Sequence, residues 1–175
     1  NKQIEEIIFT HNDISSKKVK KITRDLLNEV GLKDLSERPK VYPYELSGGQ
    51  RQRVMIAMSI ANNPDVLIAD EPTTALDVTI QMQILELLSN LQKKLGMAML
   101  FITHDLSVVK KIADYVYVMK SGEIIESNRK EEIFNNPKHE YTKRLVSSYS
   151  NKKTNIYKKD EEVLRIDELK VWYPI

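Results

Sequence analysis

An apolar run, Val66-Leu67-Ile68-Ala69, ends on two adjacent carboxylates, Asp70 and Glu71, and this pattern leaves few folds open. The run has the length and the β-branched character of a strand that is buried on both faces, as in a parallel sheet covered by helices. Paired acids at the carboxyl end of such a strand suit a metal ion and a water molecule, because hard cations prefer oxygen ligands. Alone, however, such a run is usually a core strand with a capping acid.

A second segment, Leu46-Ser47-Gly48-Gly49-Gln50, stands at the start of a helix-length run that continues to Asn62. Ser47 is a plausible N-cap for that helix, and the two glycines add amides that no side chain covers. Such a helix end attracts anions because its amides are unpaired and its dipole is positive. We therefore predict a helix terminus that faces phosphate, although a lone Ser-Gly-Gly is usually a turn.

Residues 1–45 have a helical pattern with an apolar stripe, lysines on the opposite side and Gly31 as a C-terminal cap. The stripe consists of Val19, Ile22, Leu26 and Val30. Pro39 and Pro43 then break the chain before the helix that Ser47 caps. The apolar residues of that helix are Val54, Met55, Ile56, Ala57, Met58, Ile60 and Ala61. Their density predicts that its C-terminal part is buried.

Strands and helices continue to alternate after Glu71, which favours an α/β layered fold. Asp77 can cap a helix that ends near Gly96. The next buried strand is expected at residues 99–102, with His104 near its carboxyl end. Further along we expect a short helix capped by Asp105, a hairpin of strands at residues 115–119 and 123–126, and closing helices at residues 130–134 and 141–147.

Four motifs in one order together resemble the nucleotide-binding subunit of ATP-binding-cassette (ABC) transporters. They are Leu46-Ser47-Gly48-Gly49-Gln50, the apolar run with Asp70-Glu71, Ala75-Leu76-Asp77, and the isolated His104. Three further stretches resemble oligopeptide and dipeptide importers: Tyr42-Pro43-Tyr44-Glu45, Arg51-Gln52-Arg53-Val54-Met55-Ile56-Ala57 and Asn136-Pro137-Lys138-His139-Glu140-Tyr141-Thr142. The resemblance covers most of the chain. It implies the C-terminal part of a P-loop NTPase ABC ATPase domain, with a mostly parallel sheet core and a helical subdomain that carries the signature.

The resemblance also implies where the parts of the chain begin and end. Residues 1–62 correspond to the helical and signature subdomain, and residues 63–150 to the core with the Walker B, D-loop and H-loop motifs and the closing helices. Residues 151–162 are rich in Asn, Lys, Asp and Glu, and we predict a linker there. Residues 163–175 alternate like a strand and resemble the opening strand of a second ABC ATPase domain; the alternative is that they complete the first.

No Gly-x-x-x-x-Gly-Lys-Ser/Thr loop occurs in the chain, although that loop holds the β and γ phosphates of a bound nucleotide. In the family this Walker A loop precedes the region that aligns with Asn1. We therefore expect a fragment, and the strand-like residues 163–175 favour a tandem two-ATPase parent. The fragment alone should not hydrolyse ATP, and the intact parent should be the ATPase.

By resemblance, ATP lies between the phosphate loop of one domain and the signature of the other. Ser47, Gly48 and Gly49 would then meet the γ phosphate, with Gln50 as a weaker candidate in the same turn. Asp77 would contact the partner's phosphate loop. The plainer reading of Ser47 and Asp77 is that each simply caps a helix.

The resemblance assigns the remaining roles to three side chains. Asp70 would hold Mg²⁺ through its water shell, and Glu71 would act as general base on the attacking water. His104 would position that water and the γ phosphate. Taken singly, Glu71 is equally a surface acid and His104 a packed or solvated histidine.

Composition limits the partners of the chain. Its 27 basic and 25 acidic residues are interspersed, and a net charge of +2 implies neither nucleic acid nor a strongly anionic membrane surface. The sequence has no cysteine, no apolar run long enough to cross a membrane and no signal-peptide pattern. The resemblance names a second ABC ATPase domain and transmembrane permease subunits as partners, with peptide met only indirectly. It places the protein peripherally, on the cytoplasmic face of a bacterial inner membrane.

The leading hypothesis is thus an ATPase subunit that powers peptide import. One alternative is a soluble ABC ATPase of translation or DNA repair, but the chain has no coiled-coil insert and no strongly basic arm. The other is an inactive protein that keeps the fold as a binding module. A phosphate loop in the upstream sequence of the parent gene would favour the enzyme.

Overall fold

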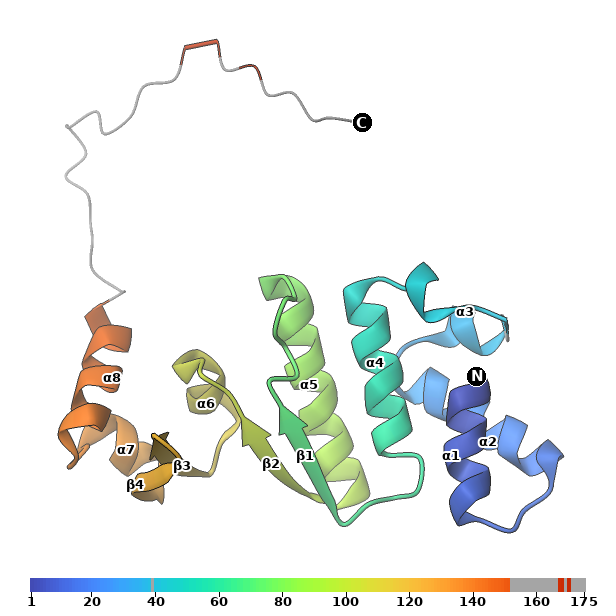
Figure 1. Ribbon diagram of the computed structural model, residues 1–175, viewed down its shortest axis with the longest axis horizontal. Coiled ribbons are helices and arrows are strands. Elements are labelled where there is room, and N and C mark those ends of the chain that lie inside the picture. The colour runs from blue at the N-terminus through green and yellow to red at the C-terminus, as the bar shows by residue number, and fades with distance from the viewer. Residues whose placement is uncertain (39, 152–166, 169, 171–175) are drawn as a thin grey trace.

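The computed structural model describes residues 1–38, 40–151, 167, 168 and 170. Figure 1 shows the elements side by side along the long axis, with the N-terminal helices at one end and α8 at the other. The N-terminal elements are α1 (Lys2–His11), α2 (Ser16–Glu29), α3 (Lys33–Ser36), the 3-10 turn η1 (Pro43–Glu45) and α4 (Gly48–Ser59). The others are β1 (Val66–Asp70), α5 (Val78–Leu95), β2 (Ala98–Ile102), α6 (Leu106–Ile112), β3 (Tyr115–Lys120), β4 (Glu123–Arg129), α7 (Lys130–Asn135) and α8 (Glu140–Asn151).

The described strands form two separate two-stranded sheets. β1 and β2 are parallel, with α5 between them in the chain, and their register pairs Asp70 with Ile102 at the carboxyl ends. β3 and β4 form an antiparallel hairpin. Its turn residues Ser121 and Gly122 have φ angles of 52° and 83°, which suit a two-residue hairpin turn. The strands predicted at residues 66–69, 99–102, 115–119 and 123–126, the hairpin and the α/β class are confirmed.

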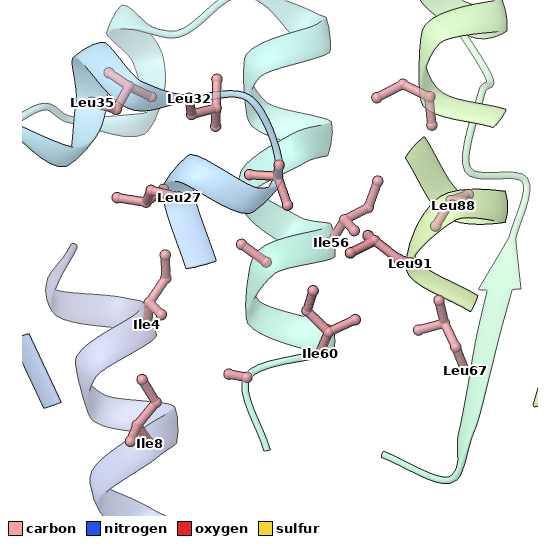
Figure 2. Packing of buried hydrophobic residues seen from close by; sticks show 14 of the residues in the cluster. Ile4, Ile8, Leu27, Leu32, Leu35, Ile56, Ile60, Leu67, Leu88 and Leu91 are labelled. Carbon is pink, nitrogen blue, oxygen red and sulfur yellow. The ribbon is translucent and has the colours of Figure 1, made fainter. Parts of the chain in front are cut away.

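Helix α4 lies at the centre of the hydrophobic core. Its Ile56 and Ile60 are only 5% and 2% exposed, so the predicted burial of its C-terminal part is confirmed, whereas Met55 points to solvent. Figure 2 shows α4 between side chains of α1, α2 and α3 (Ile4, Ile8, Leu27, Leu32 and Leu35) and side chains of α5 and β1 (Leu67, Leu88 and Leu91). Burial of each such side chain contributes about 1.5–3 kcal/mol. The core therefore joins the N-terminal helices firmly to the β1–β2 sheet.

The prediction that β1 and β2 are buried on both faces was wrong. Leu67 and Ala69 are buried, but Val66 and Ile68 on the alternate face are 55% and 64% exposed, and Leu100 of β2 is 49% exposed. The reason is that Leu67 belongs to the core formed with α4 and α5, while no described element packs on the opposite face. An apolar run shows that both faces tolerate burial, not that this chain covers both.

The stripe predicted for α2 was partly wrong. Thr23 and Leu27 are buried, whereas Ile22 and Leu26 are half-buried at the edges of the contact. The buried line runs at four-residue intervals from Val19, because that line faces the neighbouring helices. A sequence pattern that counts only apolar residues passes over the threonine.

The tail predictions fall on residues that the structure does not describe. The predicted linker at 151–162 and strand at 163–175 lie outside the described residues, except for the end of α8 and residues 167, 168 and 170. The division of the chain near residues 62 and 150 remains a prediction.

Candidate functional site

Glu71 and His104 meet where the two parallel strands end. Glu71 directly follows β1, and His104 follows β2 by two residues, so the register brings both to one edge of the sheet. The Nδ1 atom of His104 lies 2.7 Å from Oε1 of Glu71, and the backbone N–H of His104 donates to the same oxygen at 3.2 Å. Thr74 donates its hydroxyl to the other carboxylate oxygen at 3.0 Å. The Glu71 carboxylate is therefore held from both sides.

The backbone at this edge is strained. Glu71 and Ala75 have φ angles of 46° and 62°, in the left-handed region, which costs a residue other than glycine about 1–2 kcal/mol. The N–H of Glu71 donates to the carbonyl of Ile102 at 2.9 Å, which fixes this conformation at the strand end. Strained residues on a loop after a strand are a common property of functional sites, because the surrounding structure must maintain them.

Glu71 and His104 shift each other's pKa. The hydrogen bond of the His104 side chain lowers the pKa of Glu71 below its ordinary 4.5, against partial burial, and Thr74 adds to the lowering. The Glu71 carboxylate, first by its hydrogen bond and then by its charge, raises the pKa of His104 above its ordinary 6.5. Because both side chains reach solvent, the ion pair contributes little to stability. The contact with His104 does, however, make the Glu71 carboxylate a weaker base than an isolated glutamate.

We predict that Glu71→Gln lowers the pKa of His104 towards 6.5, because a neutral amide no longer favours the imidazolium. The stabilisation from the raised pKa of His104 is complete below 6.5 and is lost as pH rises through the folded value. The stabilisation from the lowered pKa of Glu71 is present above pH 4.5, and it is lost as pH falls through the pKa of Glu71 in the folded protein. NMR titration of the His104 ring measures the shift, with Glu140→Gln, which removes the distant partner of Lys143, as control. A His104 pKa that Glu71→Gln leaves unchanged contradicts the pair.

The second group of predicted residues forms the start of α4. Oγ of Ser47 accepts the N–H of Gln50 at 3.3 Å, and Oε1 of Gln50 accepts the N–H of Ser47 at 3.0 Å. This capping box confirms the N-cap. Within the described part of the chain, no hydrogen bond uses the amides of Gly48 and Gly49. Two amides at a positive helix terminus thus remain available to an anion.

The start of α5 connects the two groups. Asp77 caps α5 by accepting the N–H of Ile80 at 2.9 Å, as predicted, and Ile80 lies against Gly49. Gln81, one turn after Asp77, donates its side-chain amide to the carboxylate of Asp105 at 3.3 Å. Asp105 directly follows His104 in the chain. Asp77, the start of α4 and the loop of His104 are therefore linked through a single helix.

Asp70 stands apart from these contacts. It is the exposed last residue of β1, and its carboxylate makes no hydrogen bond or ion pair with another described residue. Thr74 and Gln81, which hold Glu71 and Asp105, were not predicted from the sequence. Only Thr74 carries a local signal, since a hydroxyl three residues after an acid in a turn is placed to bond it.

A model of the ABC transporter family matches residues 2–74. The "Peptidoglycan transport ATP-binding protein YejF" of Agrobacterium fabrum is 50% identical over 175 residues, which cover 99% of this chain and 32% of that protein. The chain belongs to the ABC transporter family. Its α/β fold is accordingly part of a P-loop NTPase domain of the ABC type.

Two other relatives agree with this ABC assignment. The "Oligopeptide transport ATP-binding protein OppD" of Bacillus subtilis is 54% identical over 147 residues, covering 84% of this chain and 41% of the relative. The "Dipeptide transport ATP-binding protein DppD" of Haemophilus influenzae is 53% identical over 146 residues, covering 83% and 44%. The ABC chain thus spans between 32% and 44% of the length of these three relatives. None of its described helices is long and apolar enough to cross a membrane.

Proposed function

We propose that this chain is part of an ATP-binding and ATP-hydrolysing subunit that energises peptide import by an ABC transporter. The observation that carries the proposal is the 2.7 Å contact between Glu71 and His104 at the ends of neighbouring parallel strands. It places a carboxylate and an imidazole together where a water molecule and a γ phosphate can be held. The names of the oligopeptide and dipeptide transport relatives support peptide as the cargo.

In the proposed reaction Glu71 accepts a proton from the attacking water as the water oxygen bonds to the γ phosphorus and ADP leaves. The hydrogen bond of His104 to Oε1 keeps the pKa of Glu71 low, and so keeps the carboxylate a weak base. We propose that His104 moves from Glu71 to the γ phosphate during turnover, where it orients phosphate and water. Thr74 remains bonded to the other oxygen and keeps the carboxylate in place.

We further propose that the open amides of Gly48 and Gly49, with the Ser47 hydroxyl, face the γ phosphate of an ATP held by the phosphate loop of a second domain. The side chain of Gln50 is engaged in the capping box, so its role is to hold this turn. Asp77 is exposed at the start of α5 and would contact the second domain's phosphate loop.

The end of β1 fits Mg²⁺ in the way nucleotide sites bind it. Mg²⁺ keeps several waters and takes one or two protein carboxylates together with substrate phosphates. Asp70 offers one exposed carboxylate without a described partner, and the described residues contain no group of three His, Cys, Asp or Glu side chains that would hold an ion alone. We propose Asp70 as the ligand, through water; the bound ion would neutralise phosphate charge.

Two protein partners belong to the proposal. The first is a second ABC ATPase domain, fused in tandem through the predicted linker at 151–162. The match with YejF supports it, because it covers 99% of this chain, whereas that with OppD covers 84%. YejF is also the longer protein, since 175 residues are only 32% of it and 147 are 41% of OppD.

The second partner is a transmembrane permease subunit, which the names of the oligopeptide and dipeptide transport relatives support. A cavity of about 340 Å³ lies beside α1 and α4 and is lined by Ile4, Val54 and Met58 among others. We propose it as an apolar binding site for a permease segment. This would hold the subunit peripherally on the cytoplasmic face of the membrane. The transport relatives favour this function over translation or DNA repair, and the Glu71–His104 pair favours an enzyme over an inactive binding module.

The experiment that tests the proposal measures MgATP hydrolysis by the full-length parent protein, reconstituted with its permease, in wild-type and His104→Ala forms. We expect peptide-stimulated turnover in the wild type and a loss of about 10²-fold in the variant, because His104 orients water and phosphate. His139→Ala is the control, because His139 forms hydrogen bonds with Glu126 and Tyr141 near α8 and not with Glu71. Unchanged turnover in His104→Ala would mean that His104 is a solvated histidine with no role in hydrolysis.

A further inference from the structure

The two glycines at the start of α4 meet different surroundings. A Cβ atom added to Gly49 would lie 2.8 Å from Cγ2 of Ile80, with Cδ1 and Cβ of the same side chain at 3.8 and 3.9 Å. A Cβ added to Gly48 would lie 3.4 Å from Cδ2 of Leu76, which is an ordinary contact. Of these two glycines, only Gly49 has no room for a side chain within the described part of the chain.

Ile80 cannot easily yield to such a Cβ. Its Cγ2 branches directly from Cβ, and a β-branched side chain in a helix has essentially one allowed χ1 rotamer. The side chain also packs against the hydrophobic core, and its backbone N–H is bound to the Asp77 carboxylate. Relief would require the start of α4 or the start of α5 to move.

A second contact fixes the same two helices one turn further along. The Arg53 guanidinium donates to the carbonyl of Val30 at 2.9 Å and to Oε1 of Gln83 at 3.1 Å. Gly49 and Arg53 are four residues apart on α4, and Ile80 and Gln83 are three apart on α5, so both pairs lie on facing helix surfaces. The close Gly49–Ile80 approach thus belongs to a built helix–helix contact.

We propose that Ile80 is a positioning residue for the signature. Its Cγ2 methyl seats the start of α4, so that the open amides of Gly48 and Gly49 keep a fixed position relative to Asp77. Gly49 is glycine because Ile80 occupies the place of a side chain, and not only because a phosphate must approach. The inference rests on the proposed function for its effect on turnover, but the steric contact is independent of ATP.

The test uses the full-length parent protein with Gly49→Ala and second substitutions at Ile80. We expect Gly49→Ala to lower Tm by about 2–5 °C. At a temperature well below each Tm, and at saturating ATP, we expect turnover to fall by about 10²-fold, because the signature amides are displaced. ATP affinity should change much less, since the signature is not the primary phosphate-binding loop.

Ile80→Leu removes Cγ2 while conserving volume, and it should restore both Tm and turnover of Gly49→Ala to within about threefold of Ile80→Leu alone. Ile80→Val keeps Cγ2 and should restore neither. Ile84→Leu, the same exchange at a buried position one turn further on, should also fail to rescue. Equal behaviour of the Leu and Val second substitutions, or a neutral Gly49→Ala, would overturn the proposal.

Two arms keep the outcomes distinct. If Gly49→Ala alone does not fold, a folded Gly49→Ala/Ile80→Leu protein is itself the rescue, and a double variant that fails while Ile80→Leu folds overturns the proposal. If the wild-type parent hydrolyses no ATP, the proposed function fails, while the Tm comparison between the Leu and Val variants still decides the role of Ile80.

Discussion

Glu71→Gln in the full-length parent protein will reduce ATP turnover by about 10²–10⁴-fold and leave ATP binding nearly unchanged. Glutamine keeps the size of the side chain and an oxygen that can accept from Thr74, but it cannot take a proton from water. Glu71 does not grip the phosphates in the proposed arrangement. The loss should therefore fall on kcat.

Turnover and the dissociation constant of ATP are to be measured on the same preparations. Glu126→Gln is the matched control, because Glu126 is also a hydrogen-bonded carboxylate with a lowered pKa, yet it accepts the N–H groups of Lys138 and His139 before α8. We expect Glu126→Gln to retain wild-type turnover at temperatures where it is folded. Equal loss of ATP binding and turnover in Glu71→Gln would assign Glu71 a structural role.

The features of this chain that the sequence predicted are local ones. Ser47, Asp77 and Asp105 cap helices because each places an oxygen within reach of an amide two or three residues later, and such contacts need no tertiary partner. Gly96 ends α5 with a φ of 65°, where a side chain would be strained. The proximity of Glu71 and His104 is not local, but it can also be predicted. Both residues follow consecutive strands, and parallel strands end at the same edge of a sheet.

The features that the sequence could not predict depend on packing between distant segments. The sequence pattern does not reveal that Gly49 lies next to Ile80, since this contact requires α4 to pack against α5. The exposed face of Ile68 was missed because an apolar residue does not say which element covers it. The ion pair between Lys94 and Glu29, which joins the ends of α5 and α2, likewise has no sequence signature. Charge, capping and turn chemistry act locally, whereas close packing is a property of the assembled core.

Gly48→Asp will abolish ATP-driven closure of this domain onto the second ATPase domain that we propose for the parent protein, and this is the second large effect that we expect. The backbone tolerates a side chain here, because an added Cβ would make only an ordinary contact with Leu76. The carboxylate, however, would stand at the open amides of the signature turn and meet the γ phosphate of the ATP held opposite. Like charges placed together in a poorly solvated site repel by several kcal/mol, so the closed form should fall by about 10²-fold or more.

ATP binding to the phosphate-loop half should survive, because that half makes its contacts without the signature. The measurement is crosslinking between the two halves of the proposed tandem protein, with and without ATP. Gly48→Asn is the matched control, since it has the same shape without the charge, and it should retain far more ATP-dependent crosslinking than Gly48→Asp. Equal crosslinking in Gly48→Asp and wild type would mean that the start of α4 does not face nucleotide. Equal loss in the Asp and Asn variants would instead assign the effect to the volume of the side chain and not to its charge.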